Sequence, residues 1–189
     1  MPRPLLILIS GPPAAGKTTL ARRLAAEFSL PLVNKDGIKE LLFDTVSARN
    51  YEEAQSLGRA SIALLYDFTE RLLTAGVSLI AESNFHAAAD SARLADLRGR
   101  QKFTPLQIHC TAPADVLEER FARRCHTAER HPGHGQASPV SLKPHIEAGV
   151  WRPLHIEGIT VIVQTDDLNA IDYVPTYRAV RDALRLMHD

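Results

Sequence analysis

The sequence predicts an α/β fold in which a parallel β-sheet carries helices on both faces. Short apolar runs with the length of buried strands recur along the chain, at 5–10, 29–34, 77–81, 103–110 and 159–163. The stretches between them place apolar residues three or four positions apart, which is the spacing of amphipathic helices. Strands that alternate with helices favour a parallel sheet, because each helix returns the chain to the edge where the previous strand began.

The stretches between the predicted strands supply the helices. The first helix is predicted at 19–28, where Leu20, Leu24 and Phe28 share one face. Residues 35–37 are predicted to form the turn that leaves the second strand. The remaining helices are expected, in chain order, at 38–42, 51–75, 87–98, 113–124, just before 148 and at 175–187, with a loop at 44–50.

The composition is that of one globular domain spanning residues 1–189. Lys+Arg and Asp+Glu both number 22, and the zero net charge argues against a protein that coats long nucleic acid. With two cysteines in the chain, a disulfide scaffold is not expected, and a reducing cytoplasm is the default location. The N-terminal apolar run has the length of a strand, and no stretch is long enough to span a membrane.

Between the first strand and the first helix lies a motif of the form G-x-x-x-x-G-K-[ST], the phosphate-binding P-loop. Its glycines permit a tight turn whose N–H groups point inward, and the helix adds its positive N-terminal end. Lys17 is expected to reach the β- and γ-phosphates, and the Thr18 hydroxyl to ligate Mg²⁺. The motif therefore predicts nucleoside triphosphate binding, with contacts from Gly11, Pro12, Pro13, Ala14, Ala15, Gly16, Lys17, Thr18 and Thr19.

Three polar residues follow predicted strands at the edge where ligands bind in such sheets. Asp36 is a candidate general base for an attacking hydroxyl, and it could equally cap the next helix. Glu82 could hold Mg²⁺ through water, bind substrate hydroxyls, or be a solvated acid at a strand end. Asn84, two residues later, is a candidate substrate contact.

Arg120 and Arg124 lie four residues apart on a predicted helix, so they share a face. They are candidates for the cations that cover a transferring phosphoryl group, or for a solvated basic face paired with neighbouring glutamates. The polar segment 125–139 that follows predicts a lid. The spacing of Cys125, His126, His131 and His134 matches no structural zinc site, which favours a histidine-bearing lid. The segment from His131 to His134 and Arg130 are candidates to reach substrate or phosphate when the lid closes.

Taken together, these segments resemble the P-loop kinases of the adenylate-kinase-like group. The most similar branch is the AAA-type one with polynucleotide 5′-hydroxyl kinases, zeta-toxin kinases and chloramphenicol phosphotransferase. Asn34-Lys35-Asp36 resembles the segment of polynucleotide kinases that ends in the general base, so the resemblance assigns this role to Asp36. Glu82-Ser83-Asn84 resembles a substrate-site Asp-Thr-Asn, and Lys39 falls at a substrate-contacting arginine. Arg120 and Arg124 resemble paired lid arginines, the second of which contacts ATP phosphates.

The resemblance implies ATP and Mg²⁺ as cofactors, a five-stranded sheet of order 2-3-1-4-5, and a lid between the fourth and fifth strands. Gly37 replaces an acid, Lys39 an arginine and Glu82 an aspartate. Lysine lacks the bidentate phosphate recognition of arginine, which argues against a nucleic-acid end as acceptor. The expected function is an ATP-dependent kinase of a small hydroxyl compound, with Lys17, Asp36 and Arg124 as catalytic residues. The alternatives are a polynucleotide 5′-hydroxyl kinase and an ATP-binding or ATPase regulatory module without an acceptor.

Overall fold

The computed structural model describes residues 3–46, 51–125, 131–134 and 141–186. The strands are β1 (Leu5–Ser10), β2 (Leu32–Asn34), β3 (Leu79–Glu82), β4 (Thr104–Thr111) and β5 (Ile159–Gln164). The helices are α1 (Lys17–Phe28), α2 (Lys35–Val46), α3 (Tyr51–Thr74), α4 (Ala87–Arg100), α5 (Ala114–Cys125), α6 (Lys143–Glu147) and α7 (Val174–Arg185), together with a 3₁₀ turn, η1 (Pro132–His134).

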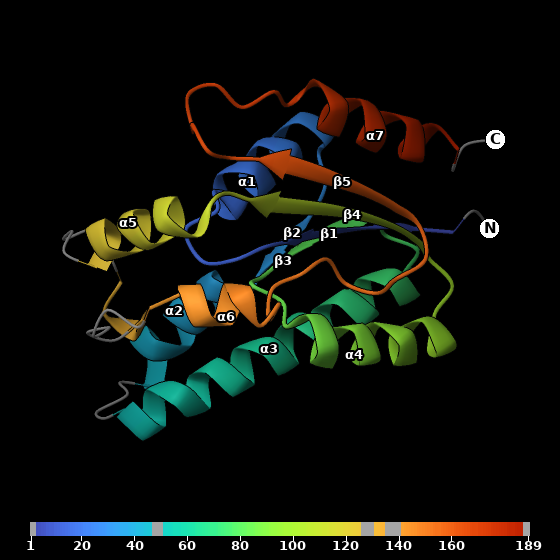
Figure 1. Ribbon diagram of the computed structural model, residues 1–189. Helices are drawn as coiled ribbons and strands as arrows, with labels where there is room; N and C mark the ends of the chain where they lie inside the picture. The colour runs from blue at the N-terminus through green and yellow to red at the C-terminus, as the bar shows by residue number, and fades with distance from the viewer. Residues whose placement is uncertain (1–2, 47–50, 126–130, 135–140, 187–189) are drawn as a thin grey trace.

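The strands form one parallel sheet in the order β2-β3-β1-β4-β5. In the centre, Ile7 of β1 stands opposite Ile80 of β3 and Leu106 of β4. Both the α/β fold class and the strand order expected from the resemblance are confirmed. The carboxyl ends of all five strands therefore meet at one edge, next to the loop that follows β1 (Figure 1).

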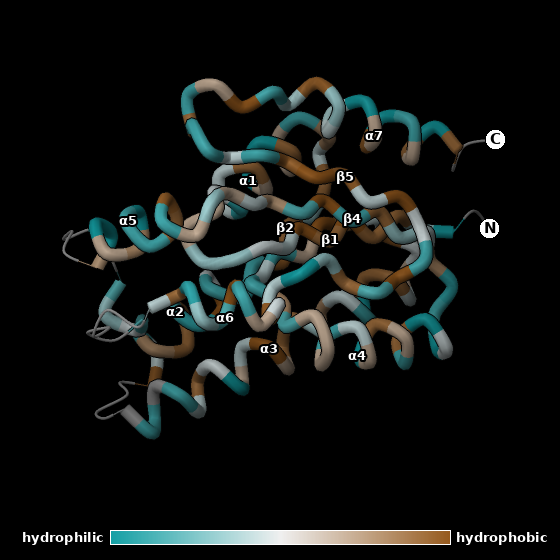
Figure 2. Tube along the Cα trace, viewed as in Figure 1, coloured by the Kyte–Doolittle hydropathy of each residue, from teal (hydrophilic) through white to brown (hydrophobic). Residues whose placement is uncertain are grey.

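Helices cover both faces of the sheet, with α1 and α7 on one side and α3 and α4 on the other (Figure 1). Alternate residues of β1 serve the two sides: Leu5, Ile7 and Ile9 join the core under α1 and α7, whereas Leu6 and Leu8 join the core under α3 and α4. Because β1 is buried on both faces, every one of its residues is apolar until Ser10. Figure 2 shows hydrophobic residues gathered along these central strands.

Helix α2 differs from the sequence prediction. It begins at Lys35, directly after β2, so the turn predicted at residues 35–37 is wrong. The side-chain oxygen of Asn34 accepts a hydrogen bond from the N–H of Gly37, three residues on, which is the geometry of a helix N-cap. The helix then continues to Val46, through the first part of the loop predicted at 44–50. Residues 47–50 lie outside the part of the chain that the structure describes.

The segment 125–139, predicted to be a lid, is described only in part. Cys125 ends α5, and residues 131–134 contain the 3₁₀ turn η1, which packs against α2. The remainder, with His126 and Arg130, lies outside the described residues. Over the described ranges, no helix combines the length and the apolar character that a membrane crossing requires.

Candidate active site

The loop between β1 and α1 has the backbone that its glycines permit. Gly11 and Gly16 adopt positive φ angles of 133° and 76°, and Ala14 does so at 64°. A Cβ atom on Gly11 would lie 2.1 Å from the carbonyl oxygen of Cys110, so a side chain at this position is excluded. The loop curves so closely against β4 that its shape depends on this glycine, and α1 begins immediately after it at Lys17.

Lys17 is buried inside the curve of the loop, with 8% of its surface exposed. Its Nζ donates a hydrogen bond to the carbonyl oxygen of Pro12 at 2.7 Å. Burial lowers the pKa of Lys17, and the Glu82 carboxylate acts in the opposite direction. The loop thus holds a buried cation, which suits anionic phosphate oxygens, and Glu82 at the end of β3 is close enough to act on its pKa.

Glu82, at the end of β3, is 3% exposed and lies beside the start of α1. Its Oε2 atom accepts a hydrogen bond from Thr18 Oγ1 at 3.1 Å and a second from the side-chain amide of Asn34. Burial raises the pKa of Glu82, and the charge of Lys17 opposes this rise. The two residues predicted to serve Mg²⁺, Thr18 and Glu82, are therefore in contact, and a hydroxyl with a carboxylate is a donor set that hard cations prefer.

Asp36 lies in the first turn of α2, and its carboxylate is about half exposed, at 48%. Lys35 Nζ is 3.0 Å from Asp36 Oδ1. Burial raises the pKa of Asp36, but the charges of Lys35, His134 and Lys17 lower it by more than burial raises it. The net pKa is therefore below its usual value. The group is therefore an ionised carboxylate at neutral pH, as a general base must be.

Two predicted acceptor contacts stand close in the sequence to these residues. Asn84 follows Glu82 by two residues, and Lys39 lies one turn after Lys35 on α2; both are half-buried. Their roles toward an acceptor stay predictions.

The two arginines of α5 have different surroundings. The guanidinium of Arg120 donates to the carbonyl oxygens of Thr165, at 2.6 Å, and Asp166, at 2.7 Å, just beyond β5. Arg124 lies in the last turn of α5 and is exposed. The charge of Arg124 lowers the pKa of Lys17, but by less than burial does, and by less than Glu82, Cys110 and Asp36 raise it. The roles of Arg124 and Arg120 toward the phosphates stay predictions.

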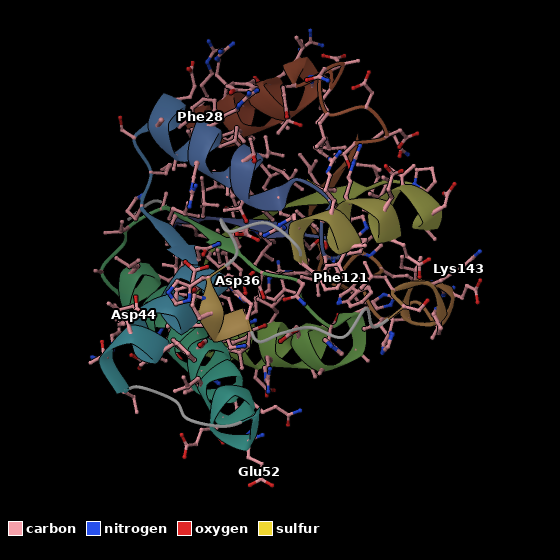
Figure 3. The ribbon with its side chains drawn as sticks, turned by 90° about the vertical axis from the view of Figure 1, so that its left-hand side faces the viewer. Phe28, Asp36, Asp44, Glu52, Phe121 and Lys143 are labelled. Carbon is pink, nitrogen blue, oxygen red and sulfur yellow. The ribbon has the colours of Figure 1, made fainter. Side chains whose placement is uncertain are left out.

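The packing of η1 on α2 brings together residues that are far apart in the sequence. His134 Nε2 is 2.8 Å from Glu40 Oε1, and His131 Nε2 is 3.1 Å from Asp44 Oδ1. Figure 3, which looks onto the carboxyl ends of the strands, shows η1 beside Asp36 at the start of α2. The sequence had marked the histidines, but nothing local in it indicated carboxylate partners about ninety residues earlier.

A second pair that sequence reasoning missed lies under the P-loop. Ser10 and His109 stand opposite each other on β1 and β4, and their Oγ and Nδ1 atoms are 3.0 Å apart. Both side chains are buried. Burial, with a contribution from Lys17, lowers the pKa of His109 to about 4, so the imidazole is neutral at physiological pH. In the described ranges no three His, Cys, Asp or Glu side chains are grouped to hold a metal ion by themselves.

Comparison with known proteins identifies the type of domain. Residues 6–137 match the family AAA_33, described as an AAA domain. A crystal structure of a kinase candidate from Chloroflexus aurantiacus j-10-fl superposes with a TM-score of 0.87 and 38% identity, covering 96% of this chain and 98% of that one. A gluconokinase from Sinorhizobium meliloti 1021 shares the fold at a TM-score of 0.57 and 14% identity, over 98% and 97% of the two chains.

A curated relative matches over a shorter stretch. The cytidylate kinase of Acidiphilium cryptum (strain JF-5) is 40% identical over 33% of this chain. The match spans 34%, about a third, of the length of that enzyme.

Proposed function

The chain belongs to the AAA domain family AAA_33 and is a P-loop kinase of the adenylate-kinase-like group; from this premise we propose that it transfers the γ-phosphate of ATP to a hydroxyl group of a small molecule. The observation that carries the proposal is the convergence of Lys17, the Thr18–Glu82 contact and Asp36 at the carboxyl ends of the strands. Transfer to a hydroxyl requires a phosphate-binding loop and, close to it, an ionised carboxylate that can accept the hydroxyl proton.

In this proposal the nucleotide is bound by the P-loop, by the start of α1 and by the end of α5, which carries Arg124. Backbone N–H groups of the P-loop and Lys17 hold the β- and γ-phosphates, and Arg124 brings a second cation to the transferred group. Thr18 and Glu82 would hold Mg²⁺, Glu82 through water, and the ion would neutralise charge on the phosphate oxygens.

On the acceptor side, Asp36 receives the proton. The acceptor oxygen forms a bond to the γ-phosphorus while the bond between this phosphorus and the β–γ bridging oxygen breaks. The hydroxyl proton passes to a carboxylate oxygen of Asp36, and ADP leaves with the bridging oxygen. Lys35 supports this role because it keeps the carboxylate ionised before the reaction.

A second candidate acceptor is the phosphate of a nucleoside monophosphate. The observation in its favour is the identity with a cytidylate kinase over a third of the chain. The two candidates differ chemically, because transfer to a hydroxyl yields an acid-stable phosphate ester and transfer to a phosphate yields an acid-labile anhydride.

The test is transfer of label from γ-labelled ATP into a cell metabolite extract, with the native protein, Asp36→Asn and the control Asp96→Asn. Asp96 is an exposed acid on α4, so its substitution makes the same chemical change away from the site. We expect an acid-stable labelled product. Its rate of formation should fall by about a hundredfold or more in Asp36→Asn and should be unchanged in the control. Label released only as free phosphate, equally by all three proteins, would show an ATPase module instead.

A further inference from the structure

Helix α2 and the turn η1 form one side of the proposed acceptor site, here named the acceptor wall (residues 35–46 and 132–134, with His131). Asp36, Glu40 and Asp44 recur at four-residue intervals on α2, so they lie along one face of the helix. His134 and His131 bond to the second and third of these acids, at 2.8 and 3.1 Å. The wall thus presents a row of carboxylates, each of which is paired within the wall.

The packing of the wall is close at its centre. Gly133 is buried against Phe43, and a Cβ atom on this glycine would come within 3.0 Å of the Phe43 Cβ. The rings of Phe43 and His131 meet edge to face, with centroids 5.7 Å apart. Figure 3 shows η1 lying next to Asp36, where an acceptor hydroxyl has to arrive. The η1 turn is therefore part of the acceptor site itself.

The charges of the wall bear on the acceptor that it can bind. Lys35 is engaged with Asp36 at 3.0 Å, as the two histidines are with Glu40 and Asp44. Lys39, the other lysine of α2, also has an interaction partner. Neither α2 nor η1 contains an arginine, the side chain that recognises phosphate and carboxylate groups with two parallel hydrogen bonds. An anionic acceptor at this wall would meet carboxylates and would have to separate existing pairs to gain a cation.

Hydroxyl groups fit the same surface without this cost. A carboxylate accepts a hydrogen bond from a hydroxyl, while lysine and imidazole N–H groups donate to one. We propose that the acceptor is a small polyhydroxylated compound without a phosphate or carboxylate group, and that Glu40, held by His134, is a residue that selects it. This inference rests on the proposed kinase function, and it separates the protein from kinases of nucleoside monophosphates and of polynucleotide ends.

The experiment divides a metabolite extract on a strong anion exchanger at neutral pH, before labelled ATP is added. Phosphorylated compounds and carboxylic acids are retained, and uncharged hydroxyl compounds pass through. We expect label transfer mainly to compounds of the flow-through, and much weaker transfer to the retained fraction, to CMP and to a 5′-hydroxyl oligonucleotide. Transfer confined to the retained fraction, CMP or the oligonucleotide overturns the inference but leaves the kinase function standing. Absence of transfer to any of these overturns both.

A variant tests the selecting residue. Glu40→Gln removes one negative charge but keeps a hydrogen-bonding side chain, so retained acceptors should gain relative to flow-through acceptors by roughly tenfold in kcat/KM. Glu27→Gln, on an exposed position of α1, is the matched control and should leave the ratio unchanged. Asp44→Asn provides the same test from the next turn of α2 if Glu40→Gln does not fold. If a folded variant leaves the ratio of kcat/KM between retained and flow-through acceptors unchanged, the substituted acid does not select the acceptor.

Discussion

The side-chain amide of Asn34 donates a hydrogen bond to the Glu82 carboxylate, on the same oxygen that accepts from Thr18. The other end of this amide, its oxygen, accepts the N–H of Gly37 and so caps α2. One side chain therefore joins the residues proposed to serve Mg²⁺ to the helix that carries the proposed base. If the capping oxygen and the bridging nitrogen have separate tasks, substitutions at Asn34 separate them.

The first prediction compares Asn34→Ser with Asn34→Ala. Serine also caps helices, but it is too short to reach Glu82, so kcat should fall by roughly ten- to a hundredfold, and the free energy of unfolding should fall by about 1 kcal/mol for the lost bond to the buried carboxylate. Alanine also loses the cap, which adds a destabilisation of about 1 kcal/mol. Urea unfolding and steady-state kinetics measure the two effects. If serine retains full kcat, the bridge to Glu82 has no part in catalysis.

The second prediction concerns pH. The pKa of Asp36 lies below its usual value although burial alone would raise it, because Lys35 and then His134 and Lys17 lower it. A base must be ionised, so activity is complete above this pKa and is lost as the pH falls through it. In Lys35→Ala the pKa of Asp36 should rise, which moves the acidic limb of the kcat/KM profile to higher pH.

The control for this profile is Lys102→Ala, an exposed lysine ahead of β4, which should leave the limb in place. A limb that moves equally in both variants, or in neither, would indicate that the titrating group is not Asp36.

The third prediction concerns stability in acid. The pKa of His109 is about 4 in the folded protein against 6.5 as its ordinary value, because burial and then Lys17 disfavour the charged ring. Between these pH values the unfolded chain binds more protons, so the free energy of unfolding decreases as the pH falls from 6.5 toward 4. The contribution is at most about 3 kcal/mol.

Asn at position 109 can keep a hydrogen bond with Ser10 but does not titrate. Urea unfolding of His109→Asn at pH 7 and pH 4.5 should therefore show a smaller loss of stability than the native protein shows. Equal losses in the two proteins would mean that other groups cause the acid sensitivity.

The sequence predicted the sheet because its information there is local. The five apolar residues of β1, the glycines of the loop and Lys17 stand next to one another, and each constrains the same turn. The strand order came from the resemblance. The start of α2 was mispredicted because Lys35-Asp36-Gly37 has the composition of a turn, and the capping oxygen of Asn34 outweighs it.

The missed parts of the site are those that depend on pairing across the chain. His134 meets Glu40 across 94 positions, and Ser10 meets His109 across 99. Periodicity places each residue on its own helix or strand, but it does not specify which face of another element will stand opposite. Arg120 shows the same limit, because helical spacing put it beside Arg124, whereas its guanidinium reaches the backbone beyond β5.

The hydrogen bonds of Arg120 have a consequence for sequence variation. Their acceptors are main-chain oxygens, which every amino acid supplies, and the Asp166 side chain is not needed for the contact. Position 166 is therefore free to drift, whereas position 120 requires a planar group that donates to two carbonyls at once. In a library of variants selected for function, substitutions should accumulate at residue 166 and be depleted at residue 120, lysine included.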